Sequence, residues 1–228
     1  MNLNDLHRRL LADVLAIGTP YPLVITGGYA VQAHGLVDRL SQDLDVATEN
    51  PAPMDDIVRT VRDGLTQRGW QVRQVRSDPL SGRLVVSDPA TGAACEVDIL
   101  KEAFWAPPTP TEYGPVLALD DVIGTKVRAL ADRGAVRDLI DVQAASRHHS
   151  TADLEALGRR HARFEFSLQD LHDRLTGADW LEDEEFAAYN LSGDQIQELR
   201  SWALHWATDI ESRLHAAQDP PEHPDSNW

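Results

Sequence analysis

A short apolar run that ends in two glycines constrains this chain more than any other feature. Residues 23 to 26, Leu-Val-Ile-Thr, have the composition of a buried strand, and Gly27-Gly28 ends it. Residues 29 to 36 follow with helical patterning. Glycine lets a phosphate approach the backbone at such a strand-to-helix turn, where the first amides of the helix also favour anions. The turn by itself fits either an anion site or a tight turn without a ligand.

The next predicted strand carries two carboxylates. Residues 43 to 48, Asp-Leu-Asp-Val-Ala-Thr, alternate between polar and apolar side chains, which indicates a half-buried strand. Asp43 and Asp45 then share one face, roughly 6 to 7 Å apart at the backbone, while Leu44 and Val46 face the core. Two such carboxylates supply the hard oxygen ligands that Mg²⁺ takes beside water and substrate phosphates. The alternative is a pair of solvated acids at a strand edge.

A later strand, residues 96 to 100, supplies a further acid. Glu96 and Asp98 alternate with apolar residues and therefore share one face of this strand. If the strand lies beside the one that carries Asp43 and Asp45, Asp98 becomes a third carboxylate of the same site. It would then orient a nucleophile or complete a metal shell. The alternative is a solvated strand acid.

The remaining patterns predict a mixed α/β unit over roughly the first hundred residues and helices after it. Pro107-Pro-Thr-Pro110, between the two parts, is expected to be a linker or a crossing loop. The predicted helices span residues 4–17, 29–36, 54–68, 119–131, 135–146, 152–162, 167–176 and 194–217, and the predicted strands span 23–26, 43–48, 70–76, 83–87 and 96–100.

The bulk composition excludes several classes of protein. The single cysteine, Cys95, excludes a disulfide framework within the chain and disfavours a cysteine-based zinc site. No segment has the apolar length of a signal peptide or a membrane span, so we expect a cytoplasmic protein that does not engage a membrane. The formal net charge of -16 disfavours a long grip on a nucleic-acid backbone, and it favours a small metal-dependent site or a basic protein partner.

Four motifs in this order resemble a known family. Gly27-Gly-Tyr-Ala-Val, His34-Gly35 and Arg39-Leu-Ser-Gln-Asp-Leu-Asp-Val are similar to the AbiEii/AbiGii toxin nucleotidyltransferases, including their MenT relatives. Lys126-Val-Arg matches the downstream helical lysine of that family, and Arg137-Asp-Leu-Ile-Asp-Val matches its later Lys/Arg-Asp-x-x-Asp block. The resemblance spans about residues 24 to 145.

The resemblance implies an α+β fold, in which a polymerase-β-like nucleotidyltransferase core (a mixed sheet flanked by helices) precedes an all-helical C-terminal half. It implies a core at 1–106 and a helical domain at 107–217, followed by a tail at 218–228 whose composition predicts disorder. The reaction would transfer a nucleoside monophosphate from an NTP to an acceptor hydroxyl, with one or two Mg²⁺ ions. Family members suggest a toxin that acts on tRNA 3′ ends and has a cognate antitoxin.

Roles for individual residues also follow from the resemblance. Lys126 would reach the triphosphate as a mobile point charge, and Asp138 would act as an acid or base or orient Lys126. The alternatives are a snorkelling helix lysine and a surface ion partner. Asp141 repeats the acid one turn later. The implied catalytic residues are Asp43, Asp45, Lys126 and Asp138, the nucleotide-binding residues are Gly27, Gly28, Arg39, Ser41 and Lys126, and the metal ligands are Asp43, Asp45 and Asp98.

One departure and two alternatives stay open. Many polymerase-β-type enzymes have Ser at the position of Gly28, so a hydroxyl contact to phosphate is missing here. A small-molecule nucleotidyltransferase of the aminoglycoside type uses the same core, and the net charge suits a cationic drug better than an RNA. A non-catalytic nucleotide-sensing module would also use this fold. If an RNA end binds, the cluster Arg159-Arg-His-Ala-Arg163 is the best basic candidate for its phosphates, although a solvated helix face is the alternative.

Overall fold

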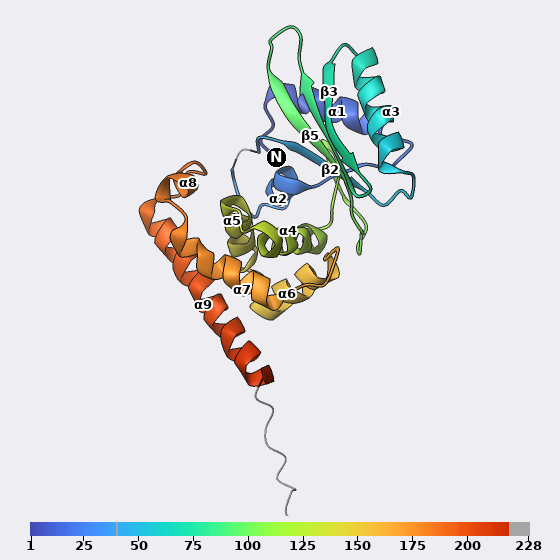
Figure 1. Cartoon of the computed structure of the whole chain (residues 1–228). Coiled ribbons are helices and arrows are strands. Elements are labelled where there is room, and N and C mark those ends of the chain that lie inside the picture. The colour runs from blue at the N-terminus through green and yellow to red at the C-terminus, as the bar shows by residue number, and fades with distance from the viewer. Residues whose placement is uncertain (40, 219–228) are drawn as a thin grey trace, which may run out of the picture. The chain divides into compact units, whose positions relative to one another are not determined.

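The computed structural model of the chain describes residues 1–39 and 41–218 (Figure 1). They divide into two compact units, Met1–Lys126 and Val127–Trp228. The boundary falls within helix α4 (Leu119–Arg133). The predicted tail 218–228 lies outside the described residues, except for Gln218, where the last helix ends.

The described part of the first unit contains a seven-stranded sheet with the order β3-β4-β5-β2-β1-β7-β6. Strand β2 is antiparallel to β1 and parallel to β5, so it lies in the interior of the sheet. The strands are β1 (Val24–Ile25), β2 (Leu44–Thr48), β3 (Gln71–Asp78), β4 (Ser81–Ser87), β5 (Ala94–Lys101), β6 (Thr109–Thr111) and β7 (Gly114–Val116).

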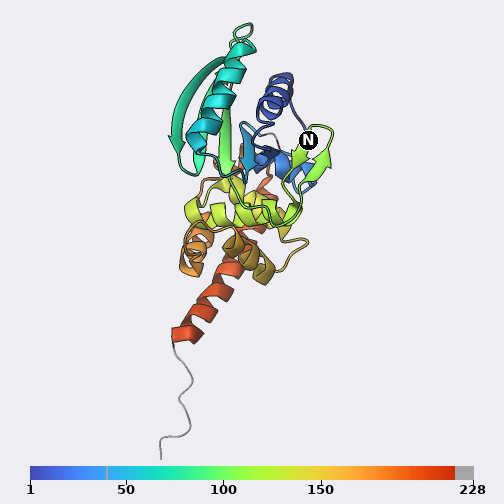
Figure 2. The same cartoon turned by 90° about the vertical axis from the view of Figure 1, so that its right-hand side faces the viewer.

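Residues 107–110 were expected to form a linker or a crossing loop, but Thr109 and Pro110 belong to a strand. Part of that segment forms β6, which pairs with β7 in a short hairpin, drawn in yellow-green beside the N-terminus in Figure 2. Strand β7 adds to β1 in parallel, with Ile25 opposite Val116. Strand β6 lies at the edge of the sheet. Proline has no backbone N–H to donate to a neighbouring strand, so Pro110 is tolerated at this edge. Proline therefore marks a sheet edge here.

Three helices precede or connect these strands. Helix α1 (Asp5–Ile17) begins where the side chain of Asn4 accepts a hydrogen bond from the backbone N–H of His7. Helix α2 (Gly27–Ala33) begins at the first glycine of the turn, two residues earlier than predicted. Helix α3 (Met54–Gln67) lies against the sheet in Figure 1, and Gly64 brings its backbone close to Ile17 of α1.

The second unit is helical in its described part. Its core includes Trp206, Phe186 and Leu171, which are all buried. The indole N–H of Trp206 donates to Glu155 at 3.0 Å, so the largest core side chain keeps its polar atom paired. The short segments at 177–180 and 183–187 were not predicted. The elements are α5 (Val136–Ala145), α6 (Thr151–Arg160), α7 (Leu168–Thr176), the 3₁₀ helix η1 (Gly177–Trp180), α8 (Asp183–Ala187) and α9 (Gly193–Gln218).

No helix within residues 1–39 and 41–218 combines the length and the apolar character that crossing a lipid bilayer requires.

Candidate active site

The glycine turn and the second carboxylate of the pair lie against each other. Gly27 has a φ of 61°, a conformation that favours glycine. A Cβ at this position would lie 2.5 Å from Cγ of Asp45 and closer still to its Oδ2. The backbone N–H of Thr26 also donates to the backbone oxygen of Asp45 at 2.9 Å. A phosphate that contacted this turn would therefore lie beside the Asp45 carboxylate.

The second glycine is covered by the loop that leads to the carboxylates. A Cβ on Gly28 would lie 2.5 Å from the Ser41 hydroxyl oxygen and 3.6 Å from Nη1 of Arg39. A side chain at residue 28 would therefore compete with Ser41 for this space. Arg39 itself is buried, although it carries a charge.

Buried polar groups hold this loop in place. The amide nitrogen of Gln32 donates to the backbone oxygen of Arg39 at 2.5 Å, and the Ser41 hydroxyl donates to the backbone oxygen of Asp43 at 3.2 Å. The Tyr29 hydroxyl lies 3.4 Å from the Ser41 backbone oxygen and 2.5 Å from Nδ1 of His7. Tyr29 and His7 were not predicted as part of the site. The sequence feature that could have indicated His7 is its position on the apolar face of α1.

Burial decides which of these groups carry charge. It raises the pKa of Tyr29 to about 12 and lowers that of His7, although the nearby Asp43 partly offsets the shift at His7. The pKa of the Cys95 thiol is raised to about 12, first by burial and then by Asp43. A thiol with this pKa stays protonated, which argues against Cys95 as a nucleophile or a metal ligand. Neither Tyr29 nor Cys95 therefore contributes a negative charge near neutral pH.

Strand β5 lies beside β2, as the hypothesis for Asp98 required. Asp45 and Asp98 are direct partners in the parallel register, which places their backbones about 4.8 Å apart. This register could not be predicted from the sequence, because no linear motif specifies which residues of two strands pair. The side chains of Asp45 and Asp98 therefore extend from adjacent positions on neighbouring strands.

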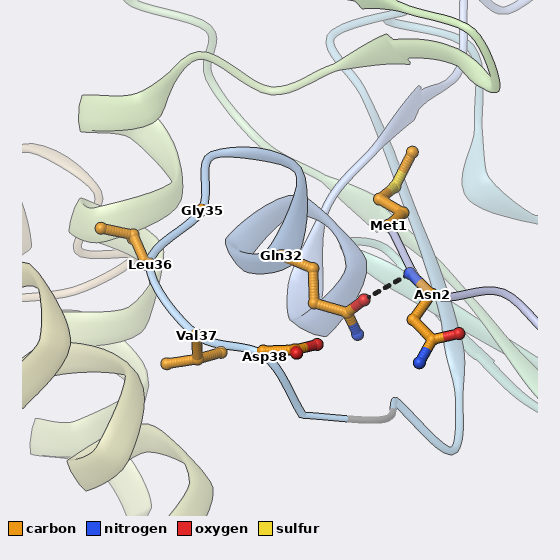
Figure 3. A pocket seen from close by; sticks show the side chains of 7 residues that line it. All are labelled: Met1, Asn2, Gln32, Gly35, Leu36, Val37 and Asp38. Atoms are coloured by element: carbon orange, nitrogen blue, oxygen red, sulfur yellow. Dashed lines mark hydrogen bonds between the residues drawn. The ribbon is translucent and has the colours of Figure 1, made fainter.

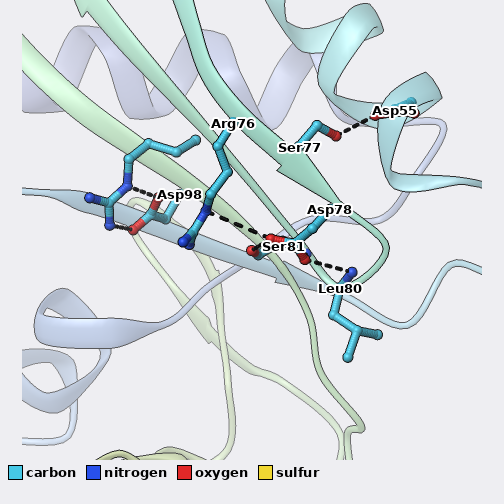
Figure 4. Close-up of polar contacts among 8 residues, drawn as sticks. Asp55, Arg76, Ser77, Asp78, Leu80, Ser81 and Asp98 are labelled. Carbon is cyan, nitrogen blue, oxygen red and sulfur yellow. Dashed lines mark hydrogen bonds and ion pairs between the residues drawn. The ribbon is translucent and has the colours of Figure 1, made fainter. Parts of the chain in front are cut away.

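An arginine that was not predicted pairs with Asp98. Nε and Nη2 of Arg83 on β4 donate to the two oxygens of Asp98 at 2.7 and 2.5 Å, and both bonds are drawn at Asp98 in Figure 4. Nη1 of Arg83 lies 2.8 Å from Glu96. The hydrogen bond to Asp98 and the charges of Asp98, Glu96 and Asp43 raise the pKa of Arg83 further. Arg83 is thus a fixed cation among several acids.

The donor set fits Mg²⁺ bound mainly by two carboxylates. Among the described residues, no group of three or more His, Cys, Asp or Glu side chains is arranged to hold a metal ion. Asp45 on β2 and Asp43, which precedes the first residue of that strand, offer hard oxygen ligands, and Asp98 is hydrogen-bonded to Arg83. Mg²⁺ characteristically uses one or two carboxylates and completes its shell with water and phosphate oxygens. Asp98 would join that shell only by sharing or releasing Arg83.

An open cavity of about 540 Å³ lies next to the C-terminal half of α2 (Figure 3). In this view the Gln32 side chain points toward Asn2, whose backbone N–H donates to it at 2.8 Å. Gln32 lies one helical turn after Gly28, so the cavity and the glycine turn share a face of the helix. The cavity is lined by Met1, Asn2, Gln32, Gly35, Leu36, Val37 and Asp38.

The later predicted residues are buried. Lys126 lies on α4 at the end of the first unit, and its low exposure disfavours a snorkelling surface lysine. In the second unit, Asp138 is fully buried and accepts two hydrogen bonds from Arg133, at 2.7 and 3.0 Å. Asp141 is buried on the same helix. Asp138 is therefore the buried partner of an arginine and not a surface ion partner.

Comparison with known proteins gives one family match. The family described as "Nucleotidyl transferase AbiEii toxin, Type IV TA system" matches residues 9–212. Among the curated proteins, no sequence matches this chain significantly.

Solved structures share the fold at low sequence identity. The chain superposes on the nucleotidyltransferase toxin MenT4 from Mycobacterium tuberculosis with a TM-score of 0.61 and 19% identity, covering 94% of this chain and 87% of MenT4. A putative nucleotidyltransferase from Helicobacter pylori gives 0.55 and 16%, covering 96% and 100% of the two chains. JHP933 from Helicobacter pylori gives 0.53 and 18%, covering 95% and 98%. The mixed sheet with flanking helices is thus the fold of this group of structures.

Proposed function

This chain belongs to the family of AbiEii nucleotidyltransferase toxins of type IV toxin–antitoxin systems, and we propose that it transfers a nucleoside monophosphate from a Mg²⁺-bound NTP to the 3′ end of tRNA. The observation that carries the chemistry is the contact between the Gly27 turn and the Asp45 carboxylate, with Asp98 on the adjacent strand. This arrangement joins a backbone site for phosphate to ligands for a hard cation. A cytoplasmic location and an antitoxin partner are part of the same proposal.

In the proposed reaction, the acceptor oxygen attacks the α-phosphorus and the bond to the β-phosphate oxygen breaks, so that pyrophosphate leaves. Gly27 and Gly28 admit the triphosphate, while Arg39 and Ser41 contact it from the loop above the turn. Asp43 and Asp45 hold the metal. The chemistry that bound Mg²⁺ supplies is charge neutralisation on the triphosphate and activation of the attacking hydroxyl.

Three further residues have roles in this proposal. Asp98, oriented by Arg83, holds the acceptor hydroxyl and takes its proton, unless it shares the metal. Lys126 offsets the charge that develops on the departing pyrophosphate. The family resemblance gives Asp138 the role of an acid, a base or an orienting group, and its carboxylate accepts two hydrogen bonds from Arg133.

A small-molecule acceptor is the second candidate, since the net charge of -16 suits a cationic acceptor such as an aminoglycoside. Both acceptors use the same metal–triphosphate half of the site. They differ only in what approaches it.

The test is incubation with each NTP labelled at the α-phosphate, in Mg²⁺, with either total tRNA or a panel of aminoglycosides. We expect label in tRNA, and a loss of roughly 100-fold or more in Asp45→Asn. If only aminoglycosides are labelled, the acceptor is a small molecule and not tRNA, and the proposal of nucleotidyl transfer stands. The paired changes Asp43→Ala and Asp45→Ala test a non-catalytic role, because a cellular effect that survives them would sink the catalytic proposal.

A further inference from the structure

One loop of the second unit holds an aromatic side chain in solvent. Residues 161 to 167 connect α6 and α7, and Phe164 in this loop is 88% exposed. A phenylalanine in this position contributes little to the core of the unit. An exposed aromatic ring on a connecting loop leaves its face open to stacking by another flat group.

Three arginines precede this phenylalanine closely in the sequence. Arg159 and Arg160 end α6, Arg163 precedes Phe164, and all three are exposed. Glu165 is the one carboxylate beside them in the sequence. The local charge is therefore positive in a chain whose net charge is -16. Such a cluster attracts a polyanion that the rest of the chain repels.

The loop is anchored on both sides of Phe164. His161 is buried, and its backbone oxygen accepts a hydrogen bond from Nη1 of Arg128 at 2.9 Å. Phe166 packs on Gly158, where a Cβ would lie 2.9 Å from the ring, and the guanidinium of Arg159 lies 5.6 Å from the ring centroid. The fold therefore fixes the residues on either side and directs Phe164 outward.

We propose that this loop is a binding surface for single-stranded RNA, in which a base stacks on Phe164 and phosphates pair with Arg160 and Arg163. Proteins that hold single strands combine aromatic platforms with cations in this way, because every base has a face that can stack. The identity of the RNA as the acceptor rests on the proposed function. The surface would bind the acceptor strand through residues other than those assigned to the metal and the triphosphate.

A second aromatic residue of this unit provides a matched control. Trp180 is 84% exposed, but its neighbours include Asp179, Glu182, Asp183 and Glu184. Exposure of an aromatic ring is therefore similar in the two places, whereas the surrounding charge is opposite. A polyanion should therefore be bound at Phe164 and not at Trp180.

The test measures binding of the full chain to fluorescent tRNA with a single-stranded 3′ end. We expect Phe164→Ala to weaken binding roughly fivefold or more, because one base can no longer stack, and Phe164→Tyr to retain it. Trp180→Ala should have no effect. The double change Arg160→Ser and Arg163→Ser should reduce the slope of log affinity against log salt by about 0.7 for each phosphate that the variant no longer neutralises. Arg73→Ser on β3 is the control for removing an exposed cation.

A probe without bases separates stacking from simple charge. The arginine changes should weaken binding of inorganic polyphosphate, whereas Phe164→Ala should not. Equal effects of Phe164→Ala and Trp180→Ala on tRNA, or an unchanged salt slope in the arginine variant, would overturn the proposal. Loss of polyphosphate binding with intact tRNA binding would assign the arginines to another anionic partner and overturn it as well.

The outcome is distinguishable from failure of the proposed function. Phe164→Ala should leave the affinity for Mg²⁺-NTP unchanged by calorimetry, since no residue assigned to the triphosphate or the metal belongs to this loop. A wild-type chain that binds tRNA through Phe164 but transfers no nucleotide would retain the surface and reject the reaction. If Phe164→Ala labels tRNA as well as the wild-type chain and with the same KM for tRNA, the reaction is retained and the binding surface is rejected.

Discussion

Gly27 and Asp45 form a single structural unit, because the space that any side chain at residue 27 would need is filled by the carboxylate of Asp45. The relationship links two motifs that are separate in the sequence. A ligand phosphate on the turn and a cation on the carboxylate would be in contact with each other. Any change that separates the two should affect both binding functions together.

Gly27→Ala should strain the backbone and displace Asp45. The left-handed conformation costs roughly 1–2 kcal/mol for a residue other than glycine, and the new methyl group overlaps the carboxylate. We expect a loss of nucleotide transfer of roughly 100-fold or more, since small displacements of reacting groups have effects of that size. The control is Gly69→Ala, where φ is 91° and no atom lies within 4 Å of the added Cβ. That variant should lose stability in urea unfolding and keep its activity.

Gly28→Ser should reduce activity, although serine is common at this position in related enzymes. The Ser41 hydroxyl lies 2.5 Å from the site of the new Cβ, so the loop has to move. Gly28→Ser combined with Ser41→Gly should recover much of the loss, because one hydroxyl then replaces the other. The measurement is a double-mutant cycle on kcat/KM for the NTP. Strictly additive effects of the two changes would show that the residues do not share this space.

Arg83→Gln should lower kcat more than it changes KM for the NTP. The change leaves the nearly buried Asp98 without its two charge-assisted hydrogen bonds, so this carboxylate loses its fixed orientation beside Asp45. We expect kcat to fall roughly 10- to 100-fold and unfolding free energy to fall by about 1–3 kcal/mol. Arg83→Lys should retain part of the activity. If kcat is unaffected while stability drops, Arg83 is only a structural cation.

Stability should fall as the pH is lowered through the range in which His7 titrates. Burial lowers the pKa of His7 in the folded chain, whereas the unfolded chain keeps the ordinary value of 6.5. The unfolded state therefore binds more protons below pH 6.5, and stability decreases from there toward the lower folded pKa. Urea unfolding at pH 7.5 and 5.5 measures the effect. His7→Gln, which keeps a polar partner for Tyr29, should show a smaller decrease between the two pH values.

The sequence by itself determined most of the local structure. Hydrophobic periodicity gave the order of helices and strands, since each pattern reflects which face of one element is buried. The Gly-Gly turn and the Asp-x-Asp spacing each suggested a phosphate or cation site and left an alternative open, and only their order with the later motifs favoured that site, because the chemistry of each motif is local. The same reasoning failed at Pro110, where proline occupies an edge strand, and at the short segments 177–180 and 183–187.

Only the tertiary structure decided which groups meet. The register of β4, β5 and β2 places Arg83, Asp98 and Asp45 side by side, and no linear pattern encodes that register. The loop over α2 brings Ser41 onto Gly28, and the start of α5 buries Asp138 against Arg133. The physical reason is that pairing and packing depend on contacts between distant segments, whereas glycine conformation and side-chain alternation act within one segment. The Gly27 turn could therefore be predicted from the sequence, whereas its contact with Asp45 could not.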